Sequence, residues 1–182
     1  MEWRNIILRI SVVVTTYNGK MHLEKQLLSL LQQERAPDEV LIFDDGSTDG
    51  TIELVQSFIR KNCLESWQFY VNAKRKGWKQ NFMEGLRKAA GDILFPCDQD
   101  DIWYPKKLAE MTAVMEQHPE IKLLACDYRV LYEPGAIKAT VYKKTPAETQ
   151  GLITRYGFTK HFFMNPYPGC TYAVRRDFFD AV

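Results

Sequence analysis

The chain has 182 residues, of which 46% are hydrophobic, so it can bury one sizeable core and is interpreted as a single domain spanning residues 1–182. Its formal net charge is +1, with acidic and basic residues interspersed, which argues against nucleic acid as a partner. The four cysteines are widely spaced and form no CxxC pair, so we expect reduced, buried thiols and no zinc site. Arg9 interrupts the apolar N-terminal stretch, which argues against a signal peptide. No apolar run approaches the roughly 20 residues that span a bilayer, so we predict a soluble, cytoplasmic protein.

Short strands and longer amphipathic segments alternate along the first 130 residues. Strands are predicted at 10–16, 39–45, 67–72 and 92–97, where β-branched and aromatic residues cluster, and we expect all four to be buried and parallel. Helical spacing predicts helices at 21–34, closed by Pro37, at 51–61 and at 78–91. In the third helix, Trp78, Phe82, Leu86 and Ala89 are expected to form the buried face, and Gly91 is expected to be the C-cap.

A fourth helix is predicted from Pro105 to the His118-Pro119 stop, followed by a strand at 121–132. The signal weakens after about residue 133, and only 169–176, GCTYAVRR, indicates a further strand. Such alternation predicts an α/β fold with a doubly wound, Rossmann-like, mostly parallel sheet and helices on both faces. Ligands of these folds bind outside the carboxyl ends of the strands.

Three polar motifs follow predicted strands and should therefore meet at one edge of the sheet: TTYN at 15–18, DDGSTDG at 44–50 and DQDD at 98–101. The carboxylates of Asp98, Asp100 and Asp101 repel one another unless they are solvated or bind a cation. Aspartates capping the helix near Pro105 are one explanation, and a site for Mg²⁺ or Mn²⁺ is another. A phosphatase of the haloacid dehalogenase type also places D-x-D after an apolar strand and stays an alternative.

The second motif and a basic loop supply groups suited to a nucleotide. Ser47, Thr48 or Asp49 can cap the next helix, whereas Asp44 and Asp45 are expected to face the crevice and accept hydrogen bonds from a base or a ribose. Tyr17 is a candidate for stacking on a base or for a core position. The loop at 74–81 adds cations suited to a diphosphate or to solvent, namely Lys74, Arg75, Lys76 and Lys79.

Four segments in this order strongly resemble the family 2 glycosyltransferases of the GT-A fold, over about residues 10–130. They are ISVVVTTYN, IFDDGSTDGT, NAKRKGWKQNF and GDILFPCDQDDIWYPKKL. DQDDIW followed by P-x-K-L resembles the bacterial branch of rhamnosyltransferases and of O-antigen and capsule glycosyltransferases. The resemblance implies metal-dependent, inverting transfer of a sugar, with rhamnose as one candidate, from a dTDP- or UDP-sugar to a saccharide or lipid-linked acceptor. It also implies a role in cell-surface polysaccharide synthesis at the inner face of the membrane, with peripheral membrane association of the full protein.

The resemblance further implies roles for individual residues. Thr15, Tyr17 and either Asp44 or Asp45 would hold the base, and Lys76 would serve the donor phosphates. Asp98 would bind the ribose and share the metal with Asp100, as a D-x-D motif does. The general base is expected beyond Val182 in a longer protein, with Asp177 and Asp180 as weak candidates, so a donor-binding module without turnover is an alternative.

Overall fold

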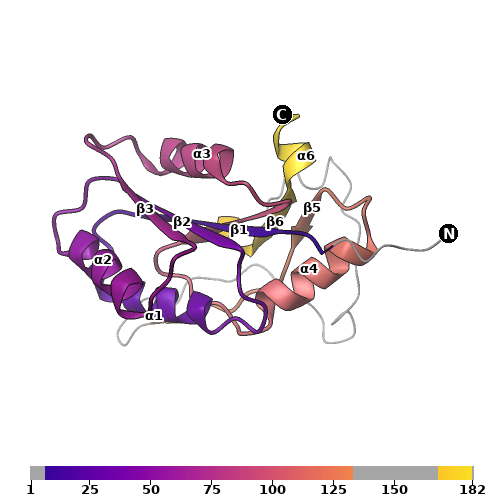
Figure 1. The fold of residues 1–182 in the computed structure, drawn as a ribbon, viewed down its shortest axis with the longest axis horizontal. Helices are drawn as coiled ribbons and strands as arrows, with labels where there is room; N and C mark the ends of the chain where they lie inside the picture. The colour runs from indigo at the N-terminus through magenta and orange to yellow at the C-terminus, as the bar shows by residue number, and fades with distance from the viewer. Residues whose placement is uncertain (1–6, 133–167, 182) are drawn as a thin grey trace.

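The computed structural model describes residues 7–132 and 168–181. Within these ranges six strands form one sheet in the order β3-β2-β1-β4-β6-β5 (Figure 1). The first four strands, β1 Ile10–Thr16, β2 Glu39–Asp44, β3 Trp67–Val71 and β4 Ile93–Asp98, are parallel. The last two, β5 Leu123–Ala125 and β6 Tyr172–Arg175, pair antiparallel to each other, and β6 is also antiparallel to β4. The predicted α/β class and the mostly parallel sheet are confirmed.

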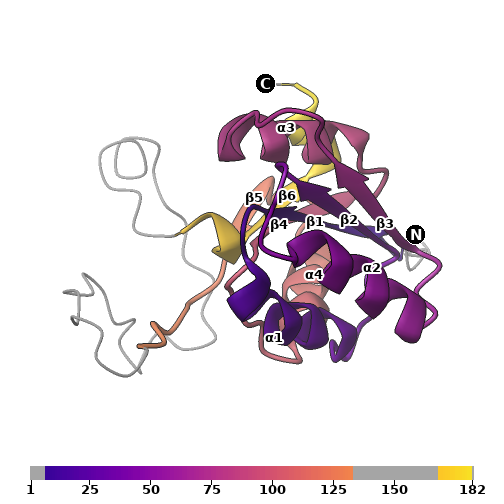
Figure 2. The same ribbon diagram turned by 90° about the vertical axis from the view of Figure 1, so that its left-hand side faces the viewer.

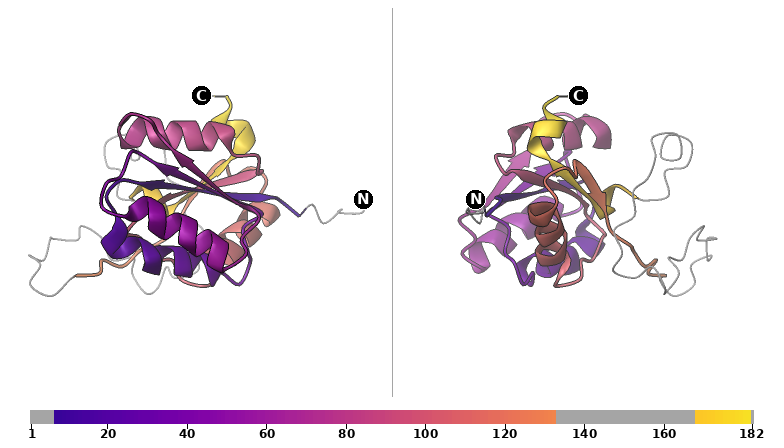
Figure 3. Two further views of the ribbon diagram at one scale, coloured as in Figure 1. Left: turned by 60° about the vertical axis from the view of Figure 1, so that its left-hand side comes forward. Right: turned by 90° about the vertical axis from the view of Figure 1, so that its right-hand side faces the viewer.

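Helices cover both faces of this sheet, as the alternation predicted. α1 Lys20–Leu31, α2 Thr51–Lys61 and α4 Lys107–Gln117 lie on one face, and α3 Trp78–Lys88 and the short α6 Arg176–Phe179 lie on the other (Figures 1 and 3). The 3₁₀ turn η2, Gly169–Thr171, directly precedes β6. In the described residues no helix has both the length and the apolar character needed to cross a membrane.

The central strands are buried on both faces because helices pack against each side of the sheet. Along β1, Val12 and Val14 join the larger core under α1, α2 and α4, whereas Val13 joins the smaller core under α3. This alternation is the two-residue period of a strand. β3 differs from the expectation of a fully buried strand, since only Trp67 is buried there. Among the described strands it forms the edge of the sheet, with β2 as its neighbour on one side.

The predicted buried face of α3 is correct for Phe82, Leu86 and Ala89, which pack in the smaller core, but wrong for Trp78. Trp78 is 68% exposed, whereas Asn81 is 1% exposed and Gly85 is buried against the sheet. The Asn81 amide donates to the Phe43 carbonyl at 2.8 Å, and a Cβ on Gly85 would lie 2.4 Å from Val13 Cγ1. A polar residue and a glycine therefore hold α3 close to the sheet, which apolar periodicity alone does not detect.

Gly91 is not the C-cap of α3, because the helix ends at Lys88 and Ala89 is its C-cap. A Cβ at Gly91 would lie 2.4 Å from Ser11 Oγ, so this glycine allows close packing against β1. The segment predicted as a strand at 121–132 contributes only the three residues of β5. The weak stretch at 133–167 lies outside the described residues. All four cysteines are free, but Cys63 is exposed, contrary to the expectation of buried thiols.

The antiparallel direction of β6 determines which segments reach each edge of the sheet. Arg175, at the end of β6, pairs with Ile93, at the start of β4. The beginning of β6, with η2 before it, therefore lies toward the carboxyl end of β4, and α6 lies toward the opposite edge (Figures 1 and 2).

Candidate functional site

The three motifs predicted to converge do meet at the carboxyl edge of the parallel strands. In the strand register, Thr15 is paired with Asp98 and Thr16 with Asp44. The side-chain amide of Gln99 bonds both backbone groups of Tyr17, accepting from its N–H at 2.8 Å and donating to its carbonyl at 3.2 Å. This pair of bonds joins the loop after β1 to the loop after β4.

Asn18 joins the loop after β1 to the loop after β2. Its backbone N–H donates to Ser47 Oγ at 2.8 Å, and its side-chain oxygen accepts from the Thr48 N–H at 2.9 Å. Asn18 adopts a left-handed φ of 47°, which asparagine tolerates better than most residues. Ser47 and Thr48 therefore connect loops and do not cap α2, whose N-cap is Gly50 with no side-chain hydrogen bond.

Asp49 is also not the N-cap of α2, although it supports the start of that helix. Its Oδ1 accepts from the Thr51 N–H at 3.0 Å and from the Thr51 hydroxyl at 2.5 Å. Burial opposes ionisation of Asp49, but these bonds and one from the Lys20 backbone lower its pKa overall. The prediction that the DDGSTDG turn supplies the N-cap of α2 is therefore wrong. Asp49 instead bonds Thr51, the first residue of α2, and the backbone of Lys20 in α1.

Asp44 is fully buried, and four hydrogen bonds occupy its carboxylate. Oδ1 accepts from the backbone N–H groups of Gly46 at 3.0 Å and Ser47 at 2.7 Å. Oδ2 accepts from the hydroxyls of Thr16 and Ser47, both at 2.6 Å. A carboxylate offers about four acceptor sites, so Asp44 is fully used in shaping the loop.

Asp45 is 3% exposed and accepts three hydrogen bonds from the segment after β3. Oδ1 accepts from the Lys76 N–H at 2.7 Å and the Asn72 amide at 3.1 Å, and Oδ2 accepts from the Gly77 N–H at 2.8 Å. Burial raises the pKa of Asp45, but these bonds and the nearby Arg75 charge outweigh it, so the pKa is lowered overall. One acceptor site remains on Oδ2, and Asp45 also holds the basic loop in place.

Within that basic loop, Arg75 and Lys76 point to different partners. The Arg75 guanidinium lies over the Tyr17 ring, with its central carbon 3.9 Å from the ring centroid. Lys76 Nζ instead forms an ion pair with Glu84 of α3 at 2.6 Å. Tyr17 is half-buried, and the Arg75 guanidinium covers one face of its ring. Sequence reasoning named both cations of this loop but gave the donor role to Lys76, because only side-chain direction separates two adjacent cations.

The acidic loop after β4 leaves Asp98 half-buried, and no hydrogen bond to its carboxylate is found among the described residues. Burial, followed by repulsion from Asp101 and Asp100, raises the pKa of Asp98 to about 6. Asp100 is exposed. These aspartates do not cap α4, because that helix starts after Lys106 and has no side-chain cap bond.

The turn before β6 adds groups to this acidic loop that the sequence did not indicate. Burial raises the pKa of Asp101, although the Cys170 thiol donates a hydrogen bond to it and partly offsets that effect. Lys107 Nζ lies 4.0 Å from the Trp103 ring centroid and donates to the Cys170 carbonyl. Lys107 thus connects α4, the acidic loop and η2.

The carboxylates at this edge fit a hard divalent cation only in part. The described residues contain no ready cluster of three or more metal-binding side chains. Mg²⁺ is nevertheless commonly held by one or two carboxylates together with substrate phosphates and water. Asp98 and Asp100 suit that kind of site, in which a bound diphosphate would complete the ligands. The pKa of Asp98 is raised, its carboxylate has no hydrogen-bond partner within residues 7–132 and 168–181, and Asp100 is exposed.

Asp177 and Asp180 are not brought to this edge. They belong to and follow α6, at the end of β6 that pairs with the start of β4. Asp177 forms an ion pair with Lys122 at 2.7 Å, which lowers its pKa, and Asp180 lies 3.7 Å from Arg176. Neither carboxylate is therefore near the groups that surround Tyr17 and Asp98.

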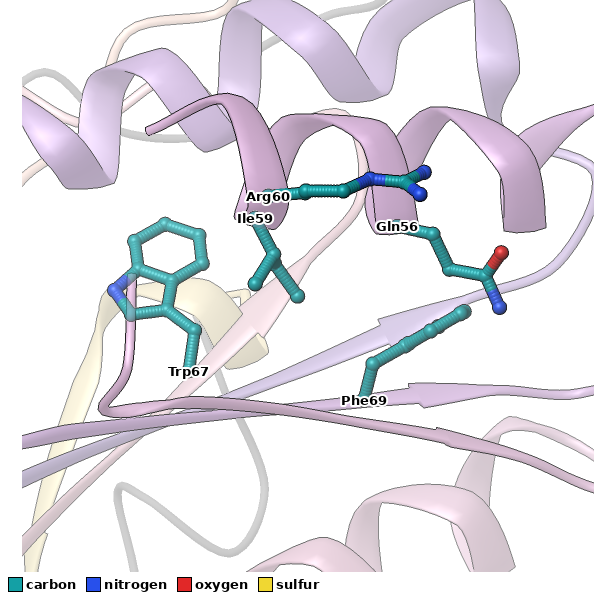
Figure 4. Close-up of a pocket in the computed structure, with 5 residues that line it drawn as sticks. All are labelled: Gln56, Ile59, Arg60, Trp67 and Phe69. Carbon is teal, nitrogen blue, oxygen red and sulfur yellow. The ribbon is translucent and has the colours of Figure 1, made fainter. Parts of the chain in front are cut away.

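A shallow depression of about 440 Å³ lies elsewhere, between α2 and the start of β3 (Figure 4). Trp67 and Phe69 line it from the strand, and Gln56, Ile59 and Arg60 line it from the helix. Trp67 is the first residue of β3, so this depression does not coincide with the carboxyl edge where the three motifs meet.

Comparison with known proteins identifies the family to which this fold and site belong. The profile of Glycosyl transferase family 2 matches residues 11–179, so the chain belongs to that family. Among its relatives, the poly(ribitol-phosphate) beta-N-acetylglucosaminyltransferase TarS of Staphylococcus aureus is 28% identical over 155 residues, covering 84% of this chain and 26% of that protein. The dTDP-rhamnosyl transferase RfbG of Shigella flexneri is 25% identical over 172 residues, covering 90% of this chain and 54% of that protein.

Solved structures show the same GT-A fold. S. aureus TarS 1–349 in complex with UDP superposes with a TM-score of 0.68 at 23% identity, covering 95% of this chain and 48% of that one. The mannosyltransferase PcManGT of Pyrobaculum calidifontis, in complex with GDP-Man and Mn²⁺, gives a TM-score of 0.68 at 21% identity, covering 96% and 46%. The chain thus spans about half the length of these two structures, and 26% of the full TarS protein.

Proposed function

We propose that this chain binds a nucleoside-diphosphate sugar and contributes to transfer of the sugar, with inversion, to an acceptor hydroxyl. The convergence of the TTYN, DDGSTDG and CDQDD loops through the Tyr17–Gln99 and Asn18–Ser47 hydrogen bonds carries this proposal. A base, a ribose and a diphosphate need an aromatic face, hydrogen-bond acceptors and positive charge close together. Tyr17, Asp45 and Arg75 supply these three within one edge of the sheet.

The base is proposed to bind against Tyr17, with Thr15 at the end of β1 lining the same place. Of the two aspartates, Asp45 is the better candidate to accept a base N–H, because Asp44 has no acceptor site left. Arg75 takes the role first considered for Lys76, since Lys76 is paired with Glu84. RfbG is named a dTDP-rhamnosyl transferase and TarS is solved with UDP, which supports a pyrimidine base, whereas PcManGT is solved with GDP-Man.

The diphosphate is proposed to lie toward the acidic loop, with Asp98 near the ribose and Asp98 and Asp100 holding Mg²⁺ or Mn²⁺ jointly with the phosphates. A divalent cation there supplies positive charge that stabilises the departing diphosphate. The raised pKa of Asp98 is consistent with a carboxylate that awaits a cation. The structure of PcManGT with GDP-Man and Mn²⁺ supports a cation in this fold.

We infer the transferred sugar and the kind of acceptor from the names of the relatives. Rhamnose is one candidate sugar because RfbG is named a dTDP-rhamnosyl transferase, and TarS is named for N-acetylglucosamine on poly(ribitol-phosphate). The TarS name supports a polymer as acceptor, and our proposal is a saccharide or lipid-linked acceptor of a cell-surface polymer at the inner face of the membrane. A module that binds donor without turnover is the second candidate, because Asp177 and Asp180 lie at the opposite edge from the donor groups.

Calorimetric titration of UDP and dTDP, with Mn²⁺ and with EDTA, tests the donor site. Replacing Arg75 with alanine should weaken binding about tenfold, the size expected for a cation stacked at a desolvated site. Lys76→Ala removes the same charge from the adjacent position and should have a smaller effect, because Lys76 is paired with Glu84. Equal losses in the two variants would refute the assignment of Arg75, and no binding of either nucleotide would refute the donor site.

Sugar transfer itself is tested by supplying UDP- and dTDP-sugars with saccharide and lipid-linked acceptors, and by measuring nucleoside diphosphate released with and without acceptor. Tight donor binding with no acceptor-dependent release would favour the binding module. Acceptor-dependent release that disappears in the Asp100→Ala variant and in EDTA would support the metal-assisted transferase.

A further inference from the structure

The outer side of α3 carries cations and exposed apolar side chains that the donor site does not use. Lys79, Met83 and Arg87 are spaced four residues apart, so they share one face of the helix, and all three are exposed. Met83 is 38% exposed and Trp78, the first residue of the helix, is 68% exposed. Lys79 Nζ lies 5.4 Å from the Trp78 ring. We call these four residues the α3 surface.

This surface lies opposite the face of α3 that packs on the sheet. Asn81 and Gly85 are buried against β1 and β2, and the small core cluster of Val13, Leu41 and Phe43 lies beneath them. α6 is the other helix on this side of the sheet, and α1, α2 and α4 cover the far side (Figures 1 and 3). The α3 surface is therefore open within the described part of the chain.

Charge is concentrated in this segment. Residues 74–88 contain six lysines and arginines and one glutamate, whereas the whole chain has a net charge of only +1. The rest of the chain is consequently acidic overall, and a segment with this excess of cations favours orientation toward an anionic surface. An exposed basic helix alone is commonly a solvated face. The exposed tryptophan and methionine among these cations distinguish this helix, since tryptophan favours the interface between water and lipid.

We propose that the α3 surface binds the protein peripherally to a bilayer rich in anionic lipid. Lys79 and Arg87 would lie at the headgroups, and Trp78 would enter the boundary between headgroups and acyl chains. Asp45 bonds the backbone of Lys76 and Gly77 just before this helix. Binding through α3 thus places the donor site at the edge of the membrane, where a lipid-linked acceptor would be presented. The acceptor role rests on the proposed function, but the membrane contact itself does not.

Sedimentation with vesicles of phosphatidylcholine alone, or mixed with phosphatidylglycerol, tests this surface. We expect partition into the anionic vesicles that falls steeply as salt rises. The double variant Lys79→Gln/Arg87→Gln should partition about 30-fold more weakly at low salt, given the usual contribution of each cation near such a membrane. Arg60→Gln/Lys61→Gln, with the same loss of charge on exposed residues of α2, is the matched control and should retain partition.

Tryptophan emission identifies the lipid contact itself. Anionic vesicles should shift the emission of the parent chain to shorter wavelength, and the Trp78→Phe variant should lose that shift while Met21→Ser, altered at a residue 80% exposed on α1, keeps it. No preference for anionic vesicles, or equal losses in the α2 control, would overturn the proposal. Equal binding to a soluble polyanion with no Trp78-dependent shift would also overturn it in favour of a polymer partner. Calorimetry with UDP on the Trp78→Phe and Arg60→Gln/Lys61→Gln variants distinguishes this failure from failure of the donor site, because none of these three residues is a candidate for that site.

Discussion

Replacing Asp98 with asparagine should stabilise the metal-free protein at neutral pH. Its carboxylate is half-buried beside Asp101 and Asp100, which raises its pKa from the ordinary 3.8 to about 6. A carboxyl group whose pKa is raised on folding stabilises the protein fully below its unfolded pKa, and loses that contribution as pH rises through the folded pKa. At about 1.4 kcal/mol per pH unit of difference, ionised Asp98 costs roughly 2 to 3 kcal/mol at pH 7.5. Asparagine keeps the shape and removes this cost.

Urea unfolding in EDTA at pH 4, 5, 6 and 7.5 measures the effect. The difference in free energy of unfolding between Asp98→Asn and the parent should be near zero at pH 4 and should grow between pH 4 and 6. Asp100→Asn, at an exposed position of the same loop, is the control and should change stability by less than about 1 kcal/mol. A variant that is less stable than the parent at pH 7.5, or a difference that does not vary with pH, would show that Asp98 is paired and would refute this explanation of the acidic loop.

Three further substitutions probe the supports of the site. Asp45→Ala should cost about 2 kcal/mol at pH 7 because it removes charged bonds to the Lys76 segment. The cost should begin to fall below the ordinary aspartate pKa of 3.8 and should decrease further as pH passes through the lowered pKa of folded Asp45; urea unfolding against pH checks this. Gly85→Ala should destabilise by about 1 to 2 kcal/mol, because the clash with Val13 exceeds the gain in helix propensity, and an unfolding midpoint that rises would contradict it. Arg176→Met should lower the free energy of unfolding by about 2 kcal/mol, since it leaves the carbonyl groups at the end of α3 without their donor, yet should leave UDP affinity unchanged in calorimetry.

The local sequence pattern was sufficient to predict the parallel part of the fold. The strands at β1, β2 and β4 and the helices α2 and α4 follow from apolar period, proline position and chain alternation. The same pattern predicted that the loops after β1, β2 and β4 meet, because parallel strands end at one edge. Within α3 the apolar period placed Phe82, Leu86 and Ala89 on the core side but was wrong for Trp78. It also did not predict the burial of Asn81 and Gly85, which depends on a hydrogen bond and on close packing.

Tertiary structure decided which members of each motif are free to act. Asp44 and Asp45 are adjacent in sequence, but only the packed loop shows that four donors fill Asp44 and leave one acceptor site on Asp45. Likewise Arg75 rather than its neighbour Lys76 lies on Tyr17, because side-chain direction depends on partners distant in sequence.

Insertion of the antiparallel strand β6 beside β4 was also beyond local pattern. This pairing brings Cys170 to Asp101 and Lys107 at one edge of the sheet, and places Asp177 at the other. Sequence alone determined the parallel part of the sheet, the edge where its loops meet and the chemical types gathered there. Strand direction and side-chain orientation are set by contacts between residues tens of positions apart, and so only the folded chain decided which of those groups meet.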